Sequence, residues 1–119
     1  MDNCIFCQIA AQADPTIILY QDNQVTAFND LLPRAPVHIL VIPNKHFDSI
    51  KDITLNDEQL LSHMLAVATI LARDNGLESN GFRLVINTGP DAGQSVFHLH
   101  LHLLGGRPMP MGFGGQASG

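Results

Sequence analysis

The chain has few positive charges and no long apolar run, and these two absences exclude several classes of function. It has 6 Lys and Arg against 11 Asp and Glu in 119 residues, and its net charge is −5 with neutral histidines. The basic residues form no run. Because nucleic acids and anionic membranes are bound through clustered positive charge, we expect neither as a partner. No segment reaches the about 18 apolar residues of a transmembrane helix, so we expect no membrane span.

Cysteine is also scarce, since Cys4 and Cys7 are the two in the chain. The N-terminus is short and acidic, unlike a secretory signal, so we expect a cytosolic protein. In that compartment a C-x-x-C pair favours metal binding or redox chemistry over a structural disulfide. A zinc site, a redox pair and two ordinary thiols in a short helix all fit the spacing, although no βαβ pattern supports the redox pair.

The length fits one domain, and 45% hydrophobic residues suffice for a core. Hydrophobic periodicity predicts a short helix over 4–11, a long helix over 56–75, and strands over 16–20, 24–29, 37–42, 82–87 and 96–104. We therefore expect an α+β domain over residues 1–107, in which a five-stranded antiparallel sheet is covered by the long helix. Residues 108–119 are expected to form a C-terminal tail.

The long helix has a regular apolar face. Asn56 is expected to cap its start, with Gln59 three residues on, and Gly76 is suited to the left-handed position after its end. The apolar face consists of Leu60, Met64, Val67, Ala68 and Leu71.

The most informative segment alternates histidine with leucine. In a strand, His98, His100 and His102 would point to one face, about 6.6 Å apart in succession, and the leucines would point to the helix. Three imidazoles on one face suit nucleophilic catalysis with a neighbouring acid, or metal binding. The third possibility is a polar face exposed to water, which the strict alternation disfavours.

Two further features fit a phosphorylated substrate. The Gly93-Gln94-Ser95 turn precedes the histidines, and its N–H groups and the Ser95 hydroxyl are suited to phosphate oxygens. Asp30 could accept hydrogen bonds from both hydroxyls of a diol. Its alternative role is that of a turn residue before Pro33.

The run from His98 to Leu104 resembles the signature of the histidine-triad family, H-φ-H-φ-H-φ-φ with φ apolar. The flanking residues 93–97 and 105–107 resemble the Hint branch, the nucleoside phosphoramidate hydrolases. Further matches lie at residues 4–7, 27–30, 35–46 and 84–87, so the resemblance extends from about residue 4 to residue 107.

The resemblance implies a role for each matching residue. His100 would be the nucleophile that forms a nucleotidyl-histidine, His102 would help the leaving group depart, and His38 would complete the cluster. No metal would be required for catalysis. An apolar pocket around the base would make the protein tolerant of purine identity. The other expected contacts are Ser95, Gln94 and Asn87 to phosphate or leaving group, Asp30 to the ribose, and Phe28, Leu31 and Phe6 to the base.

The resemblance also implies a second site and an assembly. Cys4, Cys7, His46 and His98 would hold a structural zinc ion, and catalysis would then depend on His100 and His102. Family members are typically homodimers that pair the long helix and the 82–87 strand.

The predicted activity is cleavage of purine nucleoside 5′-phosphoramidates or acyl-adenylates. Hydrolysis of dinucleoside polyphosphates, as in the Fhit branch, is the first alternative, and Gly105-Gly106-Arg107 argues against it. A nucleotide-binding or scaffolding module is the second, although the complete triad gives no sign of lost chemistry. Metal storage would need more Cys and His than the 2 and 6 present. Residues 108–113 lie where branch members vary, so the leaving group is not predicted.

Overall fold

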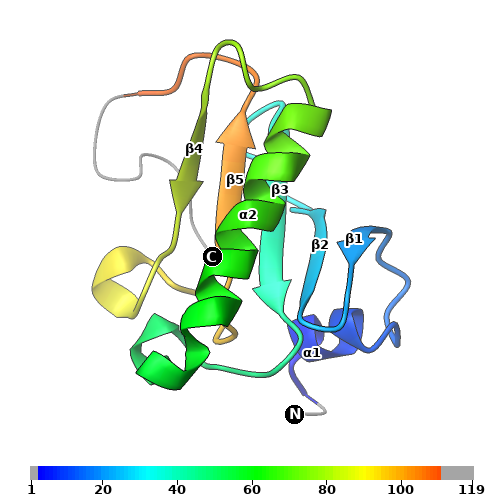
Figure 1. Ribbon diagram of the computed structural model, residues 1–119, viewed down its shortest axis with the longest axis vertical. Helices are drawn as coiled ribbons and strands as arrows, with labels where there is room; N and C mark the ends of the chain where they lie inside the picture. Colours follow the sequence, from blue (N-terminus) through cyan, green and yellow to red (C-terminus); the bar gives the residue numbers. More distant parts are fainter. Residues whose placement is uncertain (1–2, 111–119) are drawn as a thin grey trace.

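A five-stranded antiparallel sheet is the frame of the computed structural model, which describes residues 3–110 (Figure 1). Its strand order is β1-β2-β3-β5-β4. The predicted fold class is confirmed, with one long helix and a short N-terminal one. The elements are α1 (Ile5–Ala10), β1 (Ile18–Gln21), β2 (Val25–Asn29), β3 (Val37–Pro43), α2 (Glu58–Asp74), β4 (Phe82–Val85) and β5 (Leu101–Gly105).

The two faces of the sheet pack against different helices, and β3 contributes to both. Ile39 and Val41 belong to the cluster under α2, whereas Leu40 and Ile42 pack with α1. Because strand side chains alternate, consecutive residues of one buried strand face opposite layers. The face opposite α2 also carries His38 and His102. Each of them directly precedes or follows a residue of the α2 layer in sequence, so its side chain points to the other face.

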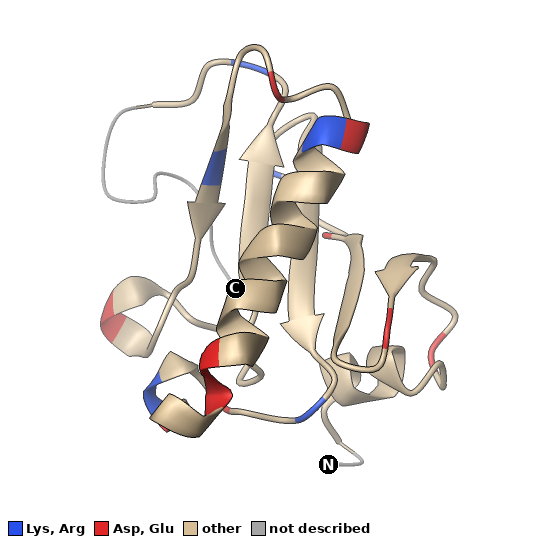
Figure 2. Ribbon diagram, in the orientation of Figure 1, with Lys and Arg blue, Asp and Glu red and all other residues tan. Residues whose placement is uncertain are grey.

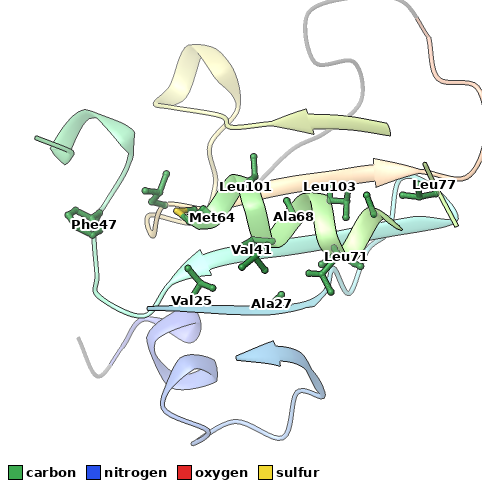
Figure 3. Packing of buried hydrophobic residues seen from close by; sticks show 14 residues of the cluster. Val25, Ala27, Val41, Phe47, Met64, Ala68, Leu71, Leu77, Leu101 and Leu103 are labelled. Atoms are coloured by element: carbon green, nitrogen blue, oxygen red, sulfur yellow. The ribbon is translucent and has the colours of Figure 1, made fainter. Parts of the chain in front are cut away.

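The α2 layer forms the main core, as the apolar periodicity predicts. Figure 3 shows Met64, Ala68 and Leu71 of α2 lying over the sheet. Each fully buried leucine stabilises the fold by about 1.5–3 kcal/mol. The histidine segment is anchored by this layer through its alternate residues, which are Leu99, Leu101 and Leu103.

The start of α2 differs from the expectation. Asn56 is not the cap, because it lies inside a 3₁₀ turn, Leu55–Asp57, that leads into the helix. Thr54 and Asp57 form the capping box instead: the Thr54 hydroxyl accepts from the Asn56 N–H, and the Asp57 carboxylate accepts from the Thr54 N–H. Gly76 has φ +75°, so the left-handed position expected after the helix is confirmed.

Strand β5 begins at Leu101, so the strand expected over 96–104 is too long at its start. Its pairing with β3 ends where Val41 lies opposite Leu101. Beyond that point Leu99 donates its N–H to the carbonyl of Phe47, in the segment that follows β3. His98 and His100 therefore lie outside the sheet, although the alternation of histidine and leucine continues. Residues 16–17 and 86–87 also lie outside the strands expected to contain them.

The surface of the described residues agrees with the sparse charge of the sequence. Figure 2 shows Lys and Arg scattered over loops and the ends of elements, apart from Arg83 on β4. No helix among residues 3–110 is both long and apolar enough to cross a bilayer.

The start of the expected tail contacts the domain. Met109 packs against Ala35, Val85 and Leu104, and the Arg83 guanidinium donates to the carbonyl of Pro110. Residues 111–119 lie outside the described residues, so the boundary at residue 107 stays a prediction.

Candidate active site

Three buried histidines meet on the face opposite α2. His38 comes from β3, His102 from β5, and His100 from the segment just before β5. None is more than 3% exposed. The ring centroids of His38 and His102 are 5.1 Å apart, and those of His100 and His102 are 4.9 Å apart. The antiparallel pairing of β3 with β5 thus brings together residues that lie about sixty positions apart in the chain.

Hydrogen bonds assign the position of each proton in this cluster. The backbone N–H of Arg34 donates to Nδ1 of His38 over 3.0 Å, so a neutral His38 carries its proton on Nε2. That Nε2–H donates to Nδ1 of His102 over 2.9 Å. His102 therefore carries its own proton on Nε2, which is buried and has no partner in the described structure. The arrangement presents a hydrogen-bond donor that a ligand can satisfy.

Burial keeps these imidazoles neutral. Burial, together with the neighbouring His100 and His38, lowers the pKa of His102 from 6.5 to about 3. Burial also lowers the pKa of His38, against the opposing effect of the Asp30 carboxylate, whose Oδ2 lies 3.4 Å from Nε2 of His38. The pKa of His100 is lowered by burial as well. Neutral rings suit nucleophilic attack and hydrogen-bond donation.

His100 is held with one nitrogen available for attack. Its Nδ1 lies 2.7 Å from the carbonyl oxygen of His98, and because a carbonyl only accepts, Nδ1 carries the proton. The lone pair is then on Nε2. Phe6 of α1 packs against the ring, with centroids 5.2 Å apart and planes at 87°. A fixed neutral imidazole beside the donor of His102 can act as a nucleophile.

A cavity of about 290 Å³ opens beside His100. This volume is close to the lower end of the roughly 300–1,000 Å³ typical of small-molecule sites. Phe6 and Phe28 meet edge to face in its wall, with centroids 5.4 Å apart. The structure therefore brings several of the predicted contacts to one place, which are Phe6, Phe28, Asp30, Leu31, Ser95 and His100.

Sequence reasoning missed other residues of this cavity. Ile5 and Ile9 are four positions apart on α1, so the helical period could have identified them beside Phe6. Asp14 and Thr16 come from the loop between α1 and β1, and no local pattern marks them. The remaining lining residues are Leu32, Arg34, Leu40 and Val96.

Gln94 and Asn87 do not line the cavity, and neither do His38 and His102, which lie with His100 in the histidine cluster. Gln94 is buried, and its side chain accepts from the Gly89 N–H and donates to the carbonyls of Asp48 and Val96. It therefore fixes the loop before the histidines. Asn87 donates its amide to the carbonyl of Ala92, which leaves its buried Oδ1 as an acceptor without a partner in the described structure. The nucleotide contacts expected of Gln94 and Asn87 stay predictions.

The four residues expected to bind metal form a second cluster. Nδ1 of His98 lies 3.4 Å from Sγ of Cys4 and 3.5 Å from Sγ of Cys7, and Nδ1 of His46 lies 3.3 Å from Sγ of Cys7. All four ligand atoms lie within 4.8 Å of one another. For tetrahedral zinc with ordinary bond lengths, sulfur and nitrogen ligand atoms are about 3.6 Å apart. The cluster can hold a metal ion.

The partners of the two histidines support this assignment. Nε2–H of His98 donates to the carbonyl of Pro43 over 2.8 Å, and Nε2–H of His46 donates to the carboxylate of Asp48 over 2.7 Å. Each histidine therefore turns an unprotonated Nδ1 toward the cysteines, as metal-binding histidines do. Asp30, His38 and His102 also place ligand atoms within 4.8 Å of one another, but there a direct hydrogen bond joins the two imidazoles.

The proton assignment of His102 leads to a prediction for histidine-selective NMR. Because burial and the neighbouring His100 and His38 lower its pKa to about 3, the His102 ring should remain neutral and protonated on Nε2 as the pH falls from 7.5 through 6.5 to about 4. The ¹⁵N shifts of the two ring nitrogens report both features, and His102→Gln identifies the signal. Titration of this ring near pH 6.5, or protonation on Nδ1, would show that the cluster is arranged differently.

Comparison with known proteins agrees with this geometry. The model of a family described as "Scavenger mRNA decapping enzyme C-term binding" matches residues 3–118. The purine nucleoside phosphoramidase of Escherichia coli K12 is 44% identical over 108 residues, which cover 91% of each chain. A HIT family hydrolase from Legionella pneumophila matches with a TM-score of 0.89 and 45% identity, over 91% of this chain and 96% of that one. A zinc-bound histidine triad family protein from Mycobacterium smegmatis matches with a TM-score of 0.78 and 34% identity, over 89% and 76%. The chain belongs to the histidine-triad (HIT) family.

Proposed function

We propose that the chain hydrolyses purine nucleoside 5′-phosphoramidates or acyl-adenylates through a nucleotidyl-histidine intermediate on His100. The observation that carries the proposal is the pairing of two buried nitrogens. His100 offers an Nε2 lone pair, because its Nδ1–H is held by the His98 carbonyl, and the adjacent His102 offers an unpartnered Nε2–H. The E. coli relative named purine nucleoside phosphoramidase supports the same reaction class.

In the first step, Nε2 of His100 attacks the α-phosphorus. The new N–P bond forms as the bond from phosphorus to the leaving nitrogen breaks, and the leaving nitrogen keeps the electron pair. Nε2–H of His102 hydrogen-bonds to that nitrogen and supplies the proton it needs. The His38–His102 pair has then lost one proton. It lies next to the positive charge that the transfer places on the His100 ring.

In the second step, water attacks the phosphorus of the nucleotidyl-histidine. The P–N bond to His100 breaks, and its electron pair returns to Nε2. The proton released by the water restores the His38–His102 pair, so the cycle balances with one water consumed. The products are a nucleoside 5′-monophosphate and the amine, or a carboxylic acid when the substrate is an acyl-adenylate.

The cavity supplies groups that suit the rest of the nucleotide. Asp30 accepts from the Leu32 N–H through Oδ1, and its remaining lone pairs suit the two ribose hydroxyls. The Ser95 hydroxyl lies in the same cavity as His100 and suits a phosphoryl oxygen. Phe6, Phe28 and Leu31 offer an apolar surface for the base.

Replacement of the nucleophile is the direct test of this function. His100→Ala should lower kcat/KM for adenosine and guanosine phosphoramidates by about 10³-fold or more, because it removes the nucleophile on which the proposed intermediate forms. Binding of the monophosphate product should persist. His63→Ala is the matched control, since His63 bonds Asp22 away from the cavity and should leave turnover unchanged.

Three results would contradict the proposal in different ways. Full activity of His100→Ala would remove the assigned nucleophile. Faster cleavage of diadenosine polyphosphates than of phosphoramidates by the wild type would reassign the branch while keeping the chemistry. Nucleotide binding with no cleavage of either substrate would favour a binding module.

We also propose that the Cys4, Cys7, His46 and His98 cluster holds a structural zinc ion, which is not needed for the phosphoryl transfer. The donor set, the turned Nδ1 atoms and the zinc-bound M. smegmatis relative support this. Zinc there would join α1 to the segment after β3 and to the histidine segment.

Elemental analysis tests the zinc site. Protein purified without chelator should contain about one zinc per chain, and Cys4→Ser with Cys7→Ser should remove it and lower the melting temperature. Protein with no bound zinc that also takes up none on addition would contradict the proposal.

A homodimer is proposed from the exposed apolar side chains of α2 and from the position of β4. Leu65 and Ile70 are each 46% exposed, and β4 has a sheet neighbour on only one side among the described strands. Sedimentation equilibrium should give twice the chain mass, and Leu65→Asp should shift the mass toward one chain. A wild-type protein of single-chain mass would contradict the dimer. The cytosolic location expected from the sequence stays a prediction.

A further inference from the structure

The cavity beside His100 contains a second carboxylate that the proposed reaction does not use. Asp30 is assigned to the ribose, but Asp14 and Thr16 also line the cavity, together with the apolar side chains of Ile5, Phe6 and Ile9 on α1. A carboxylate beside apolar side chains favours a ligand with hydrogen-bond donors.

Asp14 lies on a different segment of the chain from Asp30 and the histidines, although it lines the same cavity. Asp30 is the carboxylate whose charge acts on His38 and His100. Asp14 is instead anchored to Thr16, in the loop that follows α1. In Figure 1 this loop lies at the β1 edge of the molecule, whereas β5 runs through its centre.

A nucleotide carries its phosphate, ribose and base in succession. With its phosphorus at His100 and its ribose at Asp30, the base would occupy the rest of the cavity, whose lining includes Phe6, Phe28 and Asp14. If the apolar side chains contact the faces of the base, the carboxylate of Asp14 is left to meet the edge that carries donors and acceptors.

The carboxylate of Asp14 is held so that one oxygen remains available. Oδ1 accepts from the backbone N–H of Thr16 over 2.9 Å and from the Thr16 hydroxyl. Both bonds lower the pKa of Asp14, so the group is a carboxylate at neutral pH and can only accept. Among residues 3–110, both hydrogen bonds to the Asp14 carboxylate are made to Oδ1. Oδ2 therefore keeps its acceptor capacity.

We propose that Asp14 is a specificity-determining residue that binds the base edge and makes the protein prefer guanine nucleotides to adenine nucleotides. The inference rests on the proposed nucleotide substrate, and it replaces the tolerance of purine identity expected from an apolar pocket. Guanine presents N1–H and the 2-amino group side by side, and both donate to a carboxylate. Adenine presents a 6-amino donor beside the lone pair of N1, which repels a carboxylate.

Binding of nucleoside monophosphates to the full chain tests this directly. Isothermal titration calorimetry with GMP, IMP and AMP should give affinities that fall in that order, because hypoxanthine keeps N1–H but lacks the 2-amino group. GMP should bind about tenfold or more tightly than AMP, as expected for a hydrogen bond to a charged acceptor.

Three variants separate the local role of the Asp14 carboxylate from the effect of net charge. Asp14→Asn should bring the affinities for GMP and AMP to within about threefold of each other, because the amide can donate to N1 of adenine. Asp74→Asn removes an equal charge at the exposed end of α2 and should preserve the preference for GMP. Thr16→Val removes the hydroxyl that holds Oδ1 and should reduce the preference without abolishing it.

Cleavage of guanosine and adenosine phosphoramidates separates this inference from the proposed function. A preference for GMP that Asp14→Asn abolishes supports the inference, even if no phosphoramidate is cleaved and the proposed function fails. Equal affinities of the wild type for GMP and AMP, or a preference that survives Asp14→Asn, overturn the inference, and efficient cleavage of both substrates would then leave the proposed function intact. Absence of both binding and cleavage overturns both.

Discussion

The hydrogen bond between Nε2 of His38 and Nδ1 of His102 joins the neighbouring strands β3 and β5 on the face opposite α2. It forms inside a buried layer where a charged imidazole is costly, so its direction is set by the single donor that reaches the pair, the Arg34 N–H. This fixed direction leaves the His102 proton on Nε2, beside His100. The leucines on the other face of the same segments hold the histidines in position, because packing under α2 prevents the strand from rotating.

The proposed catalytic cluster and the candidate metal site share the short segment before β5. The side chain of His98 turns to the cysteines, while its carbonyl accepts the Nδ1–H of His100. Because this segment leaves the sheet, its carbonyl is available to the His100 ring instead of to β3. The residue expected to bind metal thus also orients the proposed nucleophile, through its backbone.

Much of this arrangement could be predicted from the sequence. The two-residue alternation of histidine and leucine gives the face packed under α2 and the face that carries the histidines without any long-range information, and the C-x-x-C spacing marks two of the four candidate metal ligands. What sequence reasoning could not supply depends on backbone groups and on loops. The backbone N–H of Arg34 donates to His38 independently of the Arg34 side chain, so the residue type gives no signal. The start of β5 depends on where its pairing with β3 begins. Asp14 resembles an ordinary loop residue until the fold places it in the cavity.

The central claim is that His100 carries the nucleotide during turnover. The most direct measurement mixes the wild type with excess guanosine 5′-phosphoramidate, quenches within the first turnovers in alkaline denaturant, and follows intact and peptide masses. The account predicts a fraction of protein heavier by one guanylyl group, with the added mass on the peptide that contains His100 and located on that ring. A guanylyl group on any other residue, or protein that stays unlabelled throughout turnover, would contradict it.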